Sequence, residues 1–182
     1  MTTPEQLADI LRRLASLITV GTVQSVTGDH CRVAIGSDSK HLTPPIKWIV
    51  GRAANRRDWS QLSVGEQVIV LSPSGNLGNA VALAGLYSNA NPAPSTDPAE
   101  TVTVMPDGAV FRYNHETHTL DMLLPSGGVA NLNADLNVDG NIVATGDISD
   151  SVRSMAADRA IYNSHNHTGD SGGSTSAPGQ QQ

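Results

Sequence analysis

Residues 132–148 alternate between apolar or small side chains and polar ones, and no other feature constrains the fold as strongly. The even positions are Leu132, Ala134, Leu136, Val138, Gly140, Ile142, Ala144, Gly146 and Ile148. The odd positions are Asn133, Asp135, Asn137, Asp139, Asn141, Val143, Thr145 and Asp147, so only Val143 interrupts the polar set. A period of two is typical of β-structure with one apolar and one solvated face.

Such a strip cannot bury its apolar face alone. It is too short for a stacked solenoid, the chain has no repeat of fixed length, and no nearby helix is free to cover it. A two-sheet sandwich or packing on the edge of a barrel stays possible. We favour three copies wound about one axis, because this arrangement hides the strand edges and suits small residues such as Gly140 and Ala144. This intertwined triple-stranded β-helix is predicted over 101–150, where Val102, Val104, Leu120, Met122 and Leu124 alternate more weakly.

The chain before this segment predicts a helix, a small barrel and a linker. Segment 1–18 is an N-terminal helix with an apolar stripe, and Thr3 is its expected cap. The stripe consists of Leu7, Ile10, Leu11, Leu14, Leu17 and Ile18. It packs either on the chain's own next domain or on another copy or partner. Short β-branched runs predict an OB-fold barrel over 19–90, and prolines mark 91–100 as a linker.

Composition narrows the possible classes of protein. The chain has 182 residues, a net charge of −6 and 3% aromatic residues. The mild negative charge argues against nucleic acid or an anionic membrane as a partner. Cys31 is the only cysteine, so one chain cannot form a disulfide framework. The N-terminus lacks the pattern of a signal peptide and no segment is apolar enough to span a membrane, so we expect assembly in the cytoplasm.

The segment 151–182 is expected to form the apex. Residues 151–163 predict a short helix capped by Asp150, and a Gly- and Ser-rich tail follows. His165 and His167 are its sharpest feature, because side chains two apart in an extended strand face the same side. Two ligands per chain are too few for a closed metal site, and the pair can equally be solvated. On a threefold axis they become six nitrogens, an octahedral set that suits iron(II) or nickel better than zinc.

Other candidate sites are weaker. His115 and His118 lie in a predicted hairpin turn, with Glu116 between them. A basic stretch with two tryptophans is either a structural loop or a surface for single-stranded nucleic acid. It contains Lys47, Trp48, Arg52, Arg56, Arg57 and Trp59. No spacing of Ser, His and acidic residues favours a catalytic set, so we expect no enzymatic activity.

Three segments resemble one family in the right order. VGEQVIVLSPSGNLGNAVALAGLYSNANPAP (64–94) is similar to the end of the OB domain in phage baseplate assembly protein V, the central spike of contractile-tailed phages and R-type pyocins. DGAVFRYNHETHTLDMLLPSGGVANLNADLNVDGNIVATGDIS (107–149) resembles its triple-stranded β-helix. SMAADRAIYNSHNHTG (154–169) resembles its apex, which ends in an HxH metal motif.

The resemblance implies a homotrimeric, non-enzymatic spike in a phage tail baseplate or tailocin particle. Its N-terminal and OB parts are expected to join the baseplate hub and tail tube, and its needle to pierce the host outer membrane. It implies one iron ion per trimer, held by His165 and His167 of three chains. Some related spikes carry a lysozyme domain where this chain has only its linker. The tail after His167 is longer and more polar than a bare point requires, and Gly172 to Gln182 either folds back along the tip or stays loose.

Two other functions remain open at this stage. An OB-fold nucleic-acid binder with a trimerising tail would hold single strands through Trp48, Arg56 and Trp59. A tailspike that cleaves surface carbohydrate would need paired carboxylates in a groove.

Overall fold

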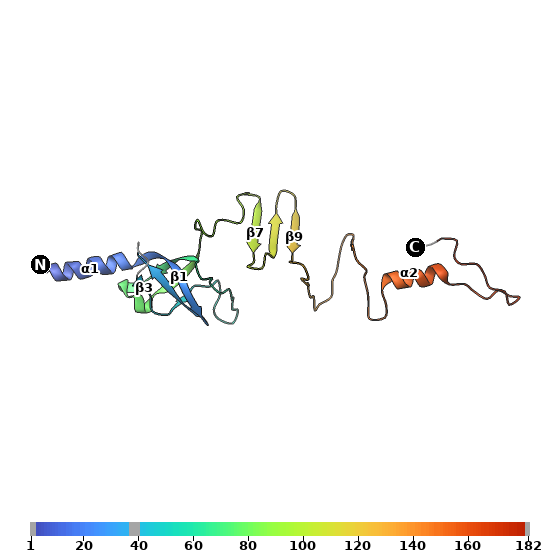
Figure 1. The fold of residues 1–182 in the computed structure, drawn as a ribbon, viewed down its shortest axis with the longest axis horizontal. Coiled ribbons are helices and arrows are strands. Elements are labelled where there is room, and N and C mark those ends of the chain that lie inside the picture. The colour runs from blue at the N-terminus through green and yellow to red at the C-terminus, as the bar shows by residue number, and fades with distance from the viewer. Residues whose placement is uncertain (1–2, 37–40, 181–182) are drawn as a thin grey trace. The chain divides into compact units, whose positions relative to one another are not determined.

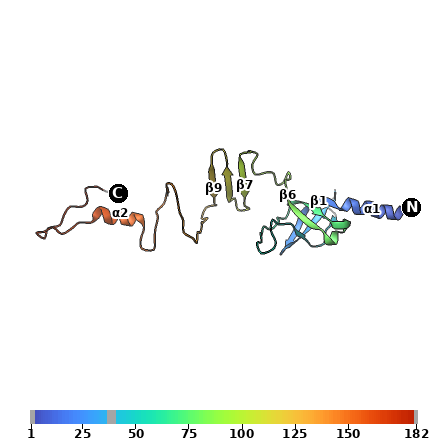
Figure 2. The same ribbon diagram turned by 180° about the vertical axis from the view of Figure 1, so that it is seen from behind.

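A computed structural model describes residues 3–36 and 41–180 of the chain (Figure 1; Figure 2). Residues 1–2 and 181–182, at the outer ends of the predicted segments 1–18 and 151–182, lie outside the described residues, as do residues 37–40 of the predicted segment 19–90. Contacts divide the chain into two units, residues 1–128 and 129–182. The protein is mainly β, with an N-terminal helix and a small barrel in the first unit, as the sequence predicts.

The N-terminal helix α1 spans Pro4–Ser16 and begins with a capping box. The Thr3 hydroxyl accepts a hydrogen bond from the Gln6 amide at 3.2 Å, and the Gln6 side-chain oxygen accepts one from the Thr3 amide at 2.9 Å. These bonds satisfy two amides that no helical carbonyl reaches, which confirms Thr3 as the cap. The helix ends before Ile18 because that residue already pairs with Leu71 in the barrel.

Five strands close the barrel. They are β1 (Ile18–Thr27), β2 (His30–Ile35), β4 (Ile46–Trp48), β5 (Gln67–Leu71) and β6 (Val81–Leu86), and the two-residue β3 (His41–Leu42) pairs with β2. The order β1-β5-β6-β4-β2 returns to β1, and every pairing is antiparallel except β4 with β6. Two short 3-10 turns, η1 (Pro73–Gly75) and η2 (Leu77–Asn79), lead into β6. This topology is that of an OB-like barrel.

Small aliphatic side chains fill the barrel. Along β5 only Val68 and Val70 are fully buried, so the strand alternates as predicted. They pack with Val23, Cys31, Val33, Ile46, Leu62, Ala80 and Ala82. The buried Thr43 hydroxyl accepts a hydrogen bond from the Val33 amide at 3.0 Å, which satisfies a donor beside the short strand β3. The cluster contains no fully buried aromatic residue, so a narrow barrel closes around valine and alanine.

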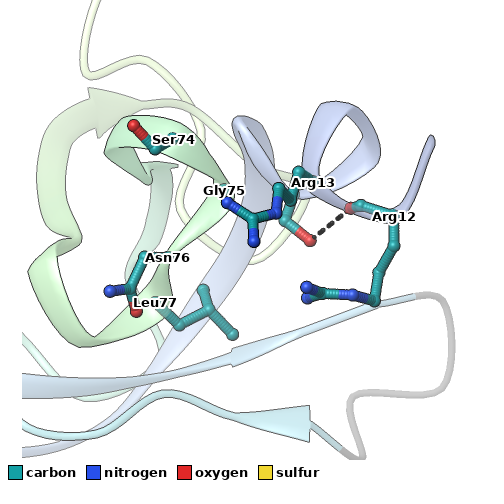
Figure 3. A pocket seen from close by; sticks show the side chains of 7 residues that line it. Arg12, Arg13, Ser74, Gly75, Asn76 and Leu77 are labelled. Atoms are coloured by element: carbon teal, nitrogen blue, oxygen red, sulfur yellow. Dashed lines mark hydrogen bonds between the residues drawn. The ribbon is translucent and has the colours of Figure 1, made fainter. Parts of the chain in front are cut away.

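Gly75 fixes the junction between α1 and the barrel (Figure 3). Its φ is +68°, and a methyl group there would lie 2.5 Å from the Arg13 carbonyl oxygen. We therefore expect Gly75→Ala to destabilise the first unit by about 1–3 kcal/mol. Thermal unfolding followed by tryptophan fluorescence measures this loss. Gly28→Ala is the control, because Gly28 has a φ of +59° with no atom within 4 Å; equal losses would show that contact with Arg13 has no effect.

A second, three-stranded antiparallel sheet follows the proline-rich segment. Its strands are β7 (Glu100–Val104), β8 (Val110–Asn114) and β9 (Thr119–Leu123), in that order (Figure 1). On one face Arg112 donates to Asp121 at 2.7 Å and lies 3.7 Å from Glu100. Together these carboxylates raise the pKa of Arg112, with the Asp121 hydrogen bond the largest cause. The other face carries the exposed side chains of Tyr113, Leu120 and Met122.

The second unit contains one helix, α2 (Met155–Ser164), and long extended segments. The alternating residues 132–148 form no strand within the chain. The triple-stranded β-helix therefore remains a prediction.

Candidate metal centre

His165 and His167 follow directly from the end of α2. The His165 amide donates to the Ile161 carbonyl at 2.9 Å and ends the helix, and its backbone is extended, with φ −69° and ψ 151°. The two imidazole centroids lie 5.1 Å apart with their planes at 87°. The structure thus brings the two predicted ligands together on one chain.

The hydrogen bond of His165 leaves one ring nitrogen free for a metal. Its Nδ1 lies 2.6 Å from the Tyr162 carbonyl oxygen. A carbonyl only accepts, so Nδ1 carries the proton and the lone pair is on Nε2. Metal-ligating histidines are commonly oriented in this way by a backbone carbonyl. Tyr162 carries no signal in the sequence other than its position three residues before His165.

The tail folds back beside the histidines. The His167 amide donates to the Thr175 hydroxyl at 2.8 Å, and the Thr175 amide donates to the His167 carbonyl at 2.8 Å. Tyr162, Ser176 and Pro178 join the two histidines around an open pocket of about 300 Å³. Of the two alternatives for the tail, folding back is the one observed up to residue 180; residues 181–182 lie outside the described part.

The start of α2 differs from the prediction. Its cap is Ser154, whose hydroxyl accepts from the Ala157 amide at 3.1 Å, and not Asp150. Asp150 instead accepts from the amides of Val152 and Arg153, which holds the preceding turn and lowers the pKa of its carboxyl. The Ser154 side chain, with help from backbone amides, likewise lowers the pKa of Asp147. An aspartate that caps a turn at 150 cannot also reach a helix that begins five residues later.

One chain alone does not complete a metal site. Across residues 3–36 and 41–180, no group of three or more His, Cys, Asp or Glu side chains is placed to hold an ion. The pair His165 and His167 fits a site that gains further imidazoles from other chains, because both rings point to the same pocket.

His115 and His118 lie in a surface turn, as predicted. They connect β8 to β9, and the Asn114 side chain accepts from the amides of Glu116 and Thr117 at 3.0 Å. His118 has a φ of +55°, which closes the hairpin. The hydrogen bonds to the Asn114 side chain account for the geometry of this turn, and no ligand is needed to explain it.

The basic stretch forms a mixed-charge pocket on the barrel. Trp48 and Trp59 lie with ring centroids 5.6 Å apart, beside a cavity of about 430 Å³. Lys47 is 3.3 Å from Asp29, and Arg56 is 3.3 Å from Asp58. These carboxylates weaken the positive potential that a phosphate backbone requires, so the arrangement favours a structural loop over a nucleic-acid surface.

This chain is similar to known proteins, both within its barrel and over nearly its whole length. The sequence profile of the type VI secretion system and phage-baseplate injector OB domain matches residues 19–87. The chain is also 28% identical to the spike protein of Escherichia phage P2, in an alignment that covers 98% of this chain and 100% of that protein. The barrel topology and the profile agree on the same residues. Residues 19–87 therefore match the family of type VI secretion system and phage-baseplate injector OB domains in both sequence pattern and barrel topology.

Proposed function

We propose that this chain is the trimeric central spike of a contractile tail baseplate, a needle that pierces the bacterial outer membrane. Similarity to a phage spike protein over nearly the whole chain supports a structural role in a tail baseplate. The observation that carries the finer proposal is the uncovered apolar strip between residues 129 and 148.

No residue between 129 and 180 is buried within the chain. Leu132, Leu136 and Ile142 expose 65%, 69% and 66% of their areas. Within residues 129–147, where every residue is described, the backbone makes no hydrogen bond to another backbone group. A folded protein does not leave this much apolar surface and this many peptide groups without partners.

Three copies supply the missing partners. Winding three strips around one axis pairs their backbones, buries the aliphatic set and leaves Asn, Asp and Thr outside. The sheet β7-β8-β9 has the same need, because Tyr113, Leu120 and Met122 lie exposed on one face. A trimer therefore accounts for two uncovered surfaces at once.

The site formed by His165 and His167 fits one ion per trimer. Two imidazoles from each of three chains make six nitrogen ligands, which suits octahedral iron(II). Such an ion ties three chains together where the load on a needle concentrates, and it couples metal binding to folding. His165 supplies Nε2 with its proton fixed on Nδ1 by the Tyr162 carbonyl.

The proposed partners follow from this role. The N-terminal helix and barrel join the baseplate hub and tail tube, and the outer membrane is the mechanical target. The spike is carried in a phage virion or tailocin particle, is assembled in the host cytoplasm and acts without catalysis. Among the described helices, none has the length and apolar character needed to cross a bilayer.

Light scattering after size exclusion, combined with metal analysis, tests the proposal. We expect a mass three times the 19.0 kDa of one chain, with one iron per trimer. A folded single chain in dilute solution would contradict the needle, the shared ion and the piercing role together. Binding of single-stranded DNA at low salt, lost on Trp59→Ala, would instead support the nucleic-acid alternative.

A further inference from the structure

Helix α1 leaves the apolar stripe along its own length uncovered, and only Leu17, just past its end, is half-buried. None of its residues is buried, and Leu7, Ile10, Leu11 and Leu14 expose between 52% and 61% of their areas. A helix of 13 residues is close to the length of about 12–15 below which isolated helices are marginal in water. The stability of α1 therefore depends on something that packs against this stripe.

The barrel contacts a different side of α1. Gly75 lies against Arg13, and a shallow pocket between helix and barrel is lined on the helix by Arg12, Arg13 and Ser16 (Figure 3). The Ser72 amide also donates to the Leu17 carbonyl at 2.9 Å. The barrel thus holds the end of the helix through its polar flank and leaves Leu7, Ile10, Leu11 and Leu14 free for another molecule.

The stripe has the spacing of a coiled coil. Leu7, Ile10, Leu14 and Leu17 are separated by three, four and three residues, which is the a-d-a-d pattern of two heptads. Leu17 retains helical dihedrals, with φ −60° and ψ −44°, although the regular helix ends at Ser16. Leu11 occupies the neighbouring e position and widens the apolar surface.

We infer that α1 from three copies of this chain forms a parallel three-helix bundle, a second trimer contact independent of the needle. This inference rests on the trimer of the proposed function. In the first heptad, leucine at a (Leu7) with isoleucine at d (Ile10) favours assemblies larger than dimers, whereas the second heptad has leucine at both positions. The wide stripe with Leu11 fits a helix that faces two neighbours. Copies already held by one needle also meet at high effective concentration, which two heptads alone need.

Charge on α1 favours sister copies over an oppositely charged partner. Asp9 accepts from Arg12 and Arg13 at 2.7 Å, and with Glu5 the helix carries two acidic and two basic side chains, so its net charge is zero. The Arg12 and Arg13 contacts also lower the pKa of Asp9. Across a parallel seam, g-position Gln6 faces Leu11 of the next helix, and no two like charges oppose each other.

Cysteine cross-linking of the full chain tests the bundle. Ile10→Cys places a thiol in the seam, and Ala8→Cys places one at the outward b position; Cys31, only 1% exposed, stays in both. With a short bismaleimide in dilute protein, we expect roughly tenfold more cross-linked dimer from position 10 than from position 8. The fraction of chains found in cross-linked dimer should reach at most about two-thirds, because a bifunctional linker joins two of the three copies in a trimer.

A second pair of variants separates the bundle from the needle. Leu14→Asp in the Ile10→Cys chain should abolish cross-linking while light scattering still gives a trimer, and Ala15→Asp should leave the yield unchanged. A trimer with equal yields at positions 8 and 10, or with yields unaffected by Leu14→Asp, would overturn the bundle and leave the proposed function standing. A single chain in solution would overturn both.

Discussion

The chain that carries His165→Ala together with His167→Ala is expected to purify as a trimer with no bound iron. All six proposed nitrogen ligands disappear, so no weaker octahedral site remains at the tip. The alternating residues 132–148, which we propose hold the trimer together, are unchanged, so the trimer should persist. Metal analysis and light scattering on the same sample measure both quantities.

The single variants and a matched control sharpen this test. His165→Ala or His167→Ala leaves three imidazoles per trimer, and we expect iron that a chelator removes much faster than from the unaltered protein. His115→Ala with His118→Ala removes the same number of histidines from the β8–β9 turn and should retain full iron. Full iron in the double variant of His165 and His167 would refute the ligand assignment.

A single aspartate among the apolar positions of residues 132–148 should prevent assembly of the proposed trimer. Ile142→Asp places three carboxylates around the shared axis, where none has a cationic partner. A buried charge without a partner costs roughly 3–5 kcal/mol, and here three of them also repel one another. We expect loss of the trimer, or loss of its resistance to heat and detergent, in light scattering and gel electrophoresis.

The adjacent polar position provides the control for that change. Asn141→Asp introduces the same carboxylate one residue away, on the set of side chains that should face water. We expect a trimer as stable as the unaltered one. Equal behaviour of the two variants would show that the alternation between 132 and 148 does not separate an inside from an outside.

Local patterns in the sequence predicted those elements whose formation depends on neighbouring residues. Thr3 caps α1 because its hydroxyl and the Gln6 side chain are close in the chain. Alternating burial along β5 follows from the two-residue period of a strand. The turn at 115–118 forms because Asn114 satisfies the amides of the next residues. Helix, barrel strands and hairpin could therefore be predicted without coordinates.

Contacts between distant residues had to come from the tertiary structure. The parallel pairing of β4 with β6 closes the barrel, yet β4 has only three residues and no visible period. Trp48 and Trp59 are in contact although a loop separates them in the sequence. Gly75 and Arg13 are in contact although most of the barrel sequence lies between them. A periodic pattern reports which face of an element is apolar, but not which element covers that face.

At residues 154–167, both residue spacing and tertiary structure were needed. The spacing of His165 and His167 pointed to a shared side, since alternate residues of an extended chain face one way. Which ring nitrogen is free, and which residue caps α2, depended on the observed hydrogen bonds of Tyr162 and Ser154. Residue spacing alone determined the candidate ligands and the alternating strip. Tertiary structure decided barrel closure, the α1 junction and the orientation of His165, because each depends on hydrogen bonds or packing whose partners the residue pattern does not specify.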